Sequence, residues 1–315
     1  MAVETRHDGG FAANGNWSQL TLMPEPKRKR NPRAERLLKE VLRERFTFEE
    51  SQGDLELLKS IYDGTYANSK PGDPSFHAYA AAVNVANEFA GQVLGFPDSI
   101  PFNNQLAELQ EEYMPSYPPV SPLTSAFFAG WVVLDARDDS TGMTLGELFV
   151  HYLQHLGTFD YVQKAMVSLN NSFCSFYEVT HVDAQGLKLW DIAGKQEVQG
   201  WCSSGYPGRK GEIWYVRVLP PFVEGLTRSV TMSTPYVFRD SSRSTWEDFF
   251  QRYLASEFAT VHPMRDYLKN GKSLGYWLEF VSQAFANYTG NMILVMGVPD
   301  DPASLPHSDP KHTLE

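Results

Sequence analysis

The chain has 315 residues, of which 42% are hydrophobic and 13% aromatic, so it can form a packed core and is not disordered as a whole. Its length corresponds to about two domains. The 27 Lys and Arg residues against 38 Asp and Glu residues give a net charge of −11. This balance excludes a general nucleic-acid coat protein, because phosphate binding needs a surplus of cations.

The two cysteines, Cys174 and Cys202, are too few for a disulfide framework. Both lie in a β-rich stretch where a single bridge could form, but we expect two reduced thiols. Residues 1–19 lack the apolar stretch of a signal peptide, and no run of about 18 apolar residues occurs. We therefore expect a cytoplasmic protein without a membrane span.

Helical spacing of apolar residues dominates the first half of the chain. The predicted helices begin at residue 31 or 32 and cover residues 54–62, 75–94, 104–113 and 144–157. The last one opens with Thr144 and Glu147, three residues apart, which is the pattern of a capping box. Residues 127–136 are apolar and fit either a buried helix or a strand. The prolines of residues 114–122 predict an extended linker or an internal strap.

Short stretches of β-forming residues, separated by turns, begin at about residue 172. The predicted strands cover residues 176–182, 187–192, 196–201, 213–219 and 229–238. Their hairpin spacing predicts a small antiparallel β-barrel, SH3-like or OB-like. Helical spacing returns after residue 240, with one helix from residue 244 or 245 and a second over residues 273–288.

The predicted fold is therefore α+β, with a small antiparallel β-barrel between two helical regions. We divide the chain into a flexible N-terminal arm at 1–30, a helical region at 31–170, the barrel module at 171–239, a C-terminal helical region at 240–298 and a flexible tail at 299–315.

Glu147, His151 and His155 are spaced four residues apart, so they project from one face of the predicted helix. Histidines at this spacing can share a metal ion, and a carboxylate can join them. The pattern is not that of the zinc proteases, and no second motif completes a two-metal site. A polar helix face is the competing interpretation. No motif indicates an organic cofactor, and we expect none.

A basic cluster at residues 27–36 holds six cations and one acid. The cations are Lys27, Arg28, Lys29, Arg30, Arg33 and Arg36. Clustered cations at a flexible end can track phosphates, so this cluster could bind nucleic acid or an acidic partner. The alternative is a solvated tail beside a charged helix.

Aromatic residues are frequent in the predicted barrel and in its 203–212 loop. They are Phe176, Tyr177, Trp190, Trp201, Tyr206, Trp214 and Tyr215. Such side chains can stack on nucleic-acid bases, but small barrels also fill their interiors with aromatics. The loop adds Arg209 and Lys210 to Tyr206, yet it lacks a phosphate-loop pattern and fits a hairpin loop better. We expect Trp214 to be buried, and Arg209 and Lys210 to be exposed.

Four segments carry a resemblance to a bacterial protein family: Ser204 to Trp214, Val216 to Pro221, Thr234 to Phe238 and Pro119 to Thr124. On this pattern, SGYxGxxGExW followed by TPYVF, the chain resembles an uncharacterised family without an established function. The resemblance implies a bacterial cytoplasmic protein with a barrel set among helices. It implies no catalytic residue.

The sequence shows neither a nucleophile elbow nor a base placed beside Cys202, so an enzyme is the less favoured interpretation. We expect a non-enzymatic interaction protein that binds another protein through its β-module. Two alternatives stay open. One is a nucleic-acid-associated protein using residues 27–36 and the barrel aromatics, and the other is a metal-dependent enzyme using Glu147, His151 and His155.

Overall fold

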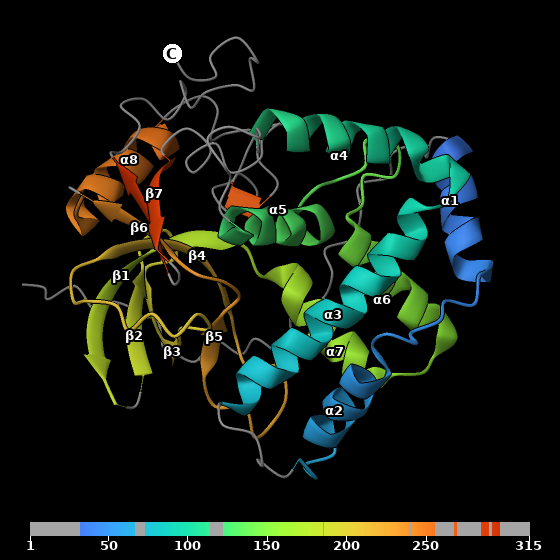
Figure 1. Cartoon of the computed structure of the whole chain (residues 1–315), viewed down its shortest axis with the longest axis horizontal. Helices are drawn as coiled ribbons and strands as arrows, with labels where there is room; N and C mark the ends of the chain where they lie inside the picture. The colour runs from blue at the N-terminus through green and yellow to red at the C-terminus, as the bar shows by residue number, and fades with distance from the viewer. Residues whose placement is uncertain are drawn as a thin grey trace, which may run out of the picture. The chain divides into compact units, whose positions relative to one another are not determined.

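The computed structural model of the chain describes residues 32–66, 73–113, 122–184, 186–239, 241–255, 268–269, 285–289 and 292–296. Within these residues the protein is α+β, with helices on both sides of a closed five-stranded barrel, as the sequence predicts (Figure 1). No helix in this described part combines the length and the apolar character that a membrane crossing needs. The arm at 1–30, most of the 114–122 linker and the tail at 299–315 lie outside it.

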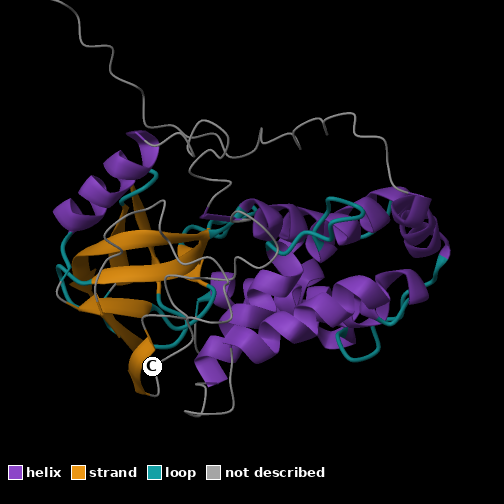
Figure 2. Cartoon of the chain, turned by 90° about the horizontal axis from the view of Figure 1, so that it is seen from above, coloured by secondary structure: helices purple, strands orange, loops and turns teal. Residues whose placement is uncertain are grey.

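Seven α-helices precede the barrel in the described part of the chain. They are α1 (Pro32–Arg43), α2 (Gln52–Tyr62), α3 (Pro74–Leu94), α4 (Ile100–Tyr113), α5 (Pro122–Leu134), α6 (Leu145–Leu156) and α7 (Asp160–Asn171), with a short 3-10 helix, η2 (Pro97–Ser99), before α4. Figure 2 shows these helices grouped beside the strands. Helical spacing predicted all of them except α5, which it left open, and α7.

Side-chain caps fix the starts of two helices that shape the structure. Asp73 accepts a hydrogen bond from the backbone N–H of Ser75 at 2.8 Å, which caps α3. The predicted capping box of α6 is confirmed: the Glu147 N–H donates to Thr144 Oγ1 at 3.1 Å, and the Thr144 N–H donates to Glu147 Oε2 at 3.0 Å. Gly157 ends α6 in the left-handed conformation, at φ +61°.

α5 and α7 are the helices that the sequence did not specify. α5 shows that the apolar stretch after residue 127 is helical as far as Leu134. α7 follows Phe159, which has a left-handed backbone at φ +62° and makes no side-chain capping bond. Because α7 lacks a capping side chain, the usual sequence signal for its start is missing.

Five strands close the barrel, and a sixth joins its rim. The strands are β1 (Cys174–Asp183), β2 (Gly186–Asp191), β3 (Gln196–Trp201), β4 (Ile213–Leu219), β5 (Ser229–Thr231) and β6 (Tyr236–Arg239). The ring runs β1-β2-β3-β5-β4 and returns to β1. The predicted strand at 229–238 is therefore two strands: β5 pairs with the end of β4, and β6 pairs with its beginning.

The barrel is mixed rather than wholly antiparallel, which corrects the predicted pairing. β3 and β5 run parallel, whereas the other four neighbours in the ring are antiparallel. A closed ring with an odd number of strands cannot alternate direction throughout, so at least one parallel pair is required.

After the helix α8 (Arg243–Ala255), the strands β7 (Phe285–Thr289) and β8 (Met292–Met296) extend the sheet from β6. β8 runs parallel to β6, and β7 runs antiparallel to β8. The helix predicted over residues 273–288 is thus wrong from Phe285 onward, and its earlier part lies outside the described residues. β7 is a strand because it pairs with β8, and β8 pairs with the distant β6, a contact that local helical spacing does not indicate.

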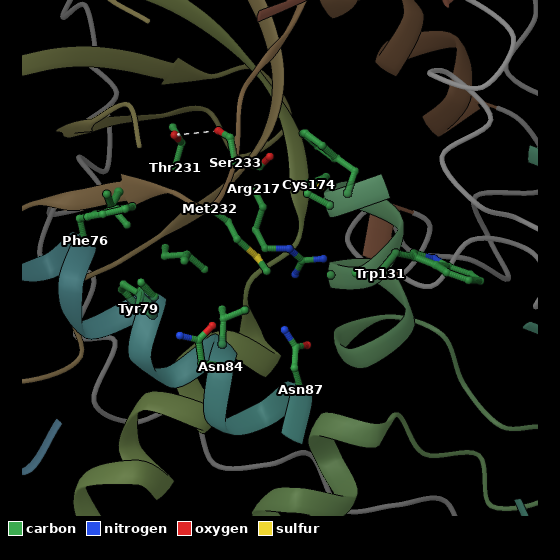
Figure 3. Close-up of a pocket in the computed structure, with 18 residues that line it drawn as sticks. Phe76, Tyr79, Asn84, Asn87, Trp131, Cys174, Arg217, Thr231, Met232 and Ser233 are labelled. Atoms are coloured by element: carbon green, nitrogen blue, oxygen red, sulfur yellow. Dashed lines mark hydrogen bonds between the residues drawn. The ribbon is translucent and has the colours of Figure 1, made fainter. Parts of the chain in front are cut away.

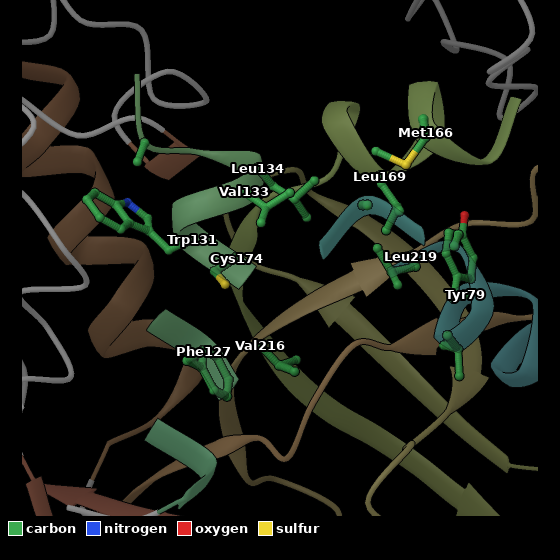
Figure 4. Close-up of a cluster of buried hydrophobic side chains, with 14 of the residues drawn as sticks. Tyr79, Phe127, Trp131, Val133, Leu134, Met166, Leu169, Cys174, Val216 and Leu219 are labelled. Atoms are coloured by element: carbon green, nitrogen blue, oxygen red, sulfur yellow. The ribbon is translucent and has the colours of Figure 1, made fainter. Parts of the chain in front are cut away.

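Helices cover the barrel from two directions. The Trp246 ring of α8 stacks on Phe176 of β1, with ring centroids 3.8 Å apart. On another side, buried Tyr79 of α3 and Leu169 of α7 lie near Leu219 of β4 (Figure 4). The helical layer and the barrel thus share one hydrophobic core.

Candidate functional site

A cavity of about 300 Å³ lies between α3, α5 and the barrel strands β4 and β5 (Figure 3). Its large apolar lining residues are Phe76, Val83, Phe127, Trp131, Leu219, Val230 and Met232. Its volume is at the lower end of the range for small-molecule sites, which are also mainly apolar with a few polar groups.

α3 turns one face toward the cavity. The lining residues of this face are Phe76, Tyr79, Ala80, Val83, Asn84 and Asn87. They recur every three or four residues, as one face of a helix requires. The neighbouring alanines Ala78 and Ala82 are fully buried in the helical core. The small residues of α3 therefore pack against other helices on one side and leave space on the other.

α5 contributes small residues at the points where a larger side chain would fill the cavity. Ala126 and Ala129 line it and are exposed. At Gly130, an added Cβ would come within 3.1 Å of Met232 Cε, so the glycine lets the methionine lie against the helix. A bulky residue at position 129 would project into the space.

Two hydroxyl groups in the lining are held by the protein itself. Thr231 Oγ1 accepts a hydrogen bond from the Ser203 N–H at 3.0 Å. The Tyr79 hydroxyl donates to the Pro220 carbonyl and lies 2.7 Å from Ser168 Oγ. Burial raises the pKa of Tyr79 well above its usual value, so this hydroxyl is neutral.

Asn84 and Asn87 form the exposed edge of the cavity. They also border a second, open depression that is lined mostly by polar side chains. Two carboxylates there are engaged by the protein: Glu88 accepts the Ser51 N–H at 3.0 Å, and Asp54 accepts from Asn84 Nδ2 at 3.0 Å. These bonds hold α2 and its start against α3.

Arg217 of β4 places a charged side chain in the cavity wall, although the residue is only 3% exposed. Its Nη2 donates to Asp135, which follows α5 and is 2% exposed. Its Nη1 donates to the carbonyl of Ser172 at 2.7 Å. Lys269 Nζ donates to the other Asp135 oxygen at 2.9 Å and to the Leu134 carbonyl at 2.8 Å. We call Asp135, Arg217 and Lys269 the buried charge cluster.

Burial governs the protonation of the groups around this cluster. It raises the pKa of the Cys174 thiol to about 11, so the thiol is neutral and a poor nucleophile. Burial also lowers the pKa of Lys269, while Asp135 opposes that shift. For Arg217, burial disfavours the charged form, but the nearby Asp135 raises the pKa overall.

The predicted metal-binding residues are not gathered into a site. Glu147 accepts two hydrogen bonds from Arg137, both 2.9 Å long, in addition to its role in the capping box. His151 is half-buried, and His155 is exposed. Among the residues that the structure describes, no group of three His, Cys, Asp or Glu side chains could hold a metal ion.

The basic cluster is only partly described, because residues 27–30 lie outside the described part. Arg33 Nε donates to the Asp98 carbonyl at 2.6 Å, and Arg33 Nη2 lies 3.5 Å from Asp138. Arg36 makes a 2.9 Å ion pair with Asp98. The two described arginines are therefore paired with acidic residues of this chain. Nucleic-acid binding by this cluster stays a prediction.

The 203–212 loop is organised around Glu212. One carboxylate oxygen accepts from Trp214 Nε1 at 3.0 Å and from the Arg209 N–H at 3.1 Å, and the other accepts from the Tyr206 hydroxyl at 2.7 Å. Trp214 is fully buried, and Arg209 and Lys210 are exposed, so the three predictions made for them are confirmed. Tyr206 is buried against Trp214 rather than presented for stacking.

The cavity and the buried charge cluster were not predicted from the sequence. Two signals were present: Arg217 interrupts the apolar strand at 213–219, and Asp135 closes the apolar stretch that begins at residue 127. A charged residue embedded in an apolar run is a sign of a buried ion pair. The partners could not be paired from the sequence, since they are 82 positions apart.

No protein-family model matches the chain, and neither a curated protein nor a solved structure matches it.

Proposed function

We propose that this protein binds a small, mainly apolar molecule in the cavity between α3, α5 and the barrel. The observation that carries the proposal is the combination of a mainly apolar lining with one buried guanidinium in the wall. Binding sites for small molecules have this composition, because apolar walls supply affinity and a few polar groups orient the ligand. The proposal keeps the expectation of a non-enzymatic binding protein.

Two further features support binding in this cavity. Ala126, Ala129 and Gly130 leave space in the α5 wall, which also includes Phe127 and Trp131. Met232 packs against this wall at Gly130. Because a methionine side chain is unbranched and flexible, it can adapt to ligands of different shape. A protein partner for the β-module stays a prediction.

The test is titration calorimetry with 1-octanol, a neutral molecule with a polar end. Wild-type protein should bind it saturably. Ala129→Phe should abolish binding, because the new ring would occupy the cavity. Ala107→Phe is the matched control, since Ala107 is an exposed alanine of α4 that does not line the cavity. Equal binding by wild type and Ala129→Phe would refute the proposal.

A further inference from the structure

The buried charge cluster contains two cations and one carboxylate. Asp135, Arg217 and Lys269 are all less than one tenth exposed. Both cations bond the same carboxylate, one at each oxygen. With all three groups ionised, the cluster carries one positive charge in excess.

Among the neighbours that the structure describes, which do not include residues 256–267 and 270–284, no carboxylate is left to offset this excess. Glu147 acts on Lys269, but it is already in a two-bond ion pair with Arg137. Cys174 lies opposite Arg217 in the β1–β4 ladder, and its thiol is neutral.

An uncompensated charge in a protein interior is costly, because the water that would solvate it is excluded. Of the three groups, only Arg217 is part of the cavity wall. Figure 3 shows its guanidinium in the space between α3 and α5. Its bonds to Asp135 and Ser172 engage Nη1 and Nη2, and Nε–H takes part in none of them.

We propose that the natural ligand carries a single negative charge, a carboxylate, which lies against Arg217 while its apolar body lies along α3 and α5. This inference rests on the proposed function. A monoanion matches the single excess charge, and a guanidinium bonds a carboxylate with favourable geometry. The apolar lining of the rest of the cavity selects an acid with a hydrocarbon body, such as a medium-chain fatty acid or an arylalkanoic acid.

The test compares three eight-carbon probes that differ in their charged end: octanoate, 1-octanol and octylammonium. Calorimetry at pH 8 should give octanoate an affinity roughly tenfold or more above that of 1-octanol, the ratio expected from one charge-assisted hydrogen bond. Octylammonium should bind more weakly than 1-octanol, because its charge would meet the excess cation.

Two variants test the role of the cluster. Lys269→Met removes the excess charge but keeps the Arg217–Asp135 pair, so the preference for octanoate over 1-octanol should shrink. Arg217→Met removes the contact itself, and the preference should vanish while 1-octanol still binds. If Arg217→Met does not fold, Lys269→Met carries the test, because Asp135 keeps Arg217 as its partner and no buried charge is left unpaired.

The results separate the two proposals. Equal affinity of wild type for octanoate and 1-octanol, or an unchanged preference in Lys269→Met, would overturn the carboxylate inference and leave the cavity proposal standing. Binding of none of the three probes would overturn both. If Lys269 is neutral in the folded protein, the cluster has no excess charge. In that case Lys269→Met would prefer octanoate over 1-octanol as strongly as wild type does.

Discussion

Arg217 of β4 and Asp135 at the end of α5 form a buried ion pair that joins the barrel to the helical layer. Lys269 reaches the same carboxylate from a third segment of the chain. Three segments that are distant in sequence therefore meet at one acidic side chain. The same pair places a guanidinium in the wall of the cavity, so it serves both the fold and the proposed site.

Removing this carboxylate should destabilise the protein strongly. Asp135→Ala leaves two buried cations without a counterion, and breaking a buried pair in this way costs about 3–5 kcal/mol. Urea denaturation followed by circular dichroism measures the loss. Asp63→Ala is the control, since it removes an exposed ion pair with Lys59 and should leave the midpoint nearly unchanged. Equal midpoints for the two variants would show that the cluster has no structural role.

Trp214 should be essential to the barrel, whereas Arg209 should not. Trp214→Ala removes a fully buried ring and should cost about 3–5 kcal/mol, whereas Arg209→Ala removes an exposed side chain and should leave stability almost unchanged. Thermal melts of both variants test this difference. If Trp214→Ala melts like wild type, the packing of the barrel described above is wrong.

Alanine substitutions at two glycines of the 203–212 loop distinguish backbone strain from steric clash. Gly205 and Gly208 both have φ +73°, so alanine at either position is strained by about 1 kcal/mol. At Gly208 the new Cβ would also lie 2.6 Å from Trp214 Cζ2, whereas at Gly205 it meets no atom within 4 Å. Gly208→Ala should therefore have the lower urea midpoint of the two. Equal midpoints would mean that Trp214 does not pack on residue 208.

The buried Cys174 thiol should make stability fall in alkaline solution. Its pKa is raised from 9.0 to about 11, so the unfolded chain loses this proton first as pH rises. The neutral thiol therefore contributes fully to the free energy of unfolding below pH 9. This contribution is lost as pH approaches 11, at up to about 1.4 kcal/mol per pH unit. Urea denaturation at pH 8 and pH 10.5 should show a smaller loss for Cys174→Ala than for wild type. The same loss in both proteins would rule out a buried neutral thiol.

Local sequence chemistry predicted most of the secondary structure. The capping box at Thr144 predicted the start of α6, and alternating apolar and polar residues predicted the barrel strands. α7 was missed because Phe159 precedes it without a capping side chain. β7 was predicted as helix, but it pairs with β8, which in turn pairs with the distant strand β6. Propensity is a weak guide wherever long-range pairing decides the structure.

The candidate site was harder to predict than the fold. Its helix face at α3 follows ordinary helical spacing, but nothing in that spacing distinguishes a cavity wall from a packed interface. The ion pair joins residues 82 positions apart, and neither has a local motif. The predicted metal set stays a prediction: Glu147 has the required spacing, but Arg137 and the helix cap already engage it.

A crystal structure of the protein soaked with octanoate would show the binding mode itself. We expect one octanoate in the cavity, with its carboxylate within hydrogen-bonding distance of the Arg217 guanidinium and its chain between α3 and α5. Ala129→Phe crystals treated in the same way should show the cavity filled by the new ring. An empty cavity in the wild-type crystal, or octanoate with its carboxylate directed away from Arg217, would refute this binding mode.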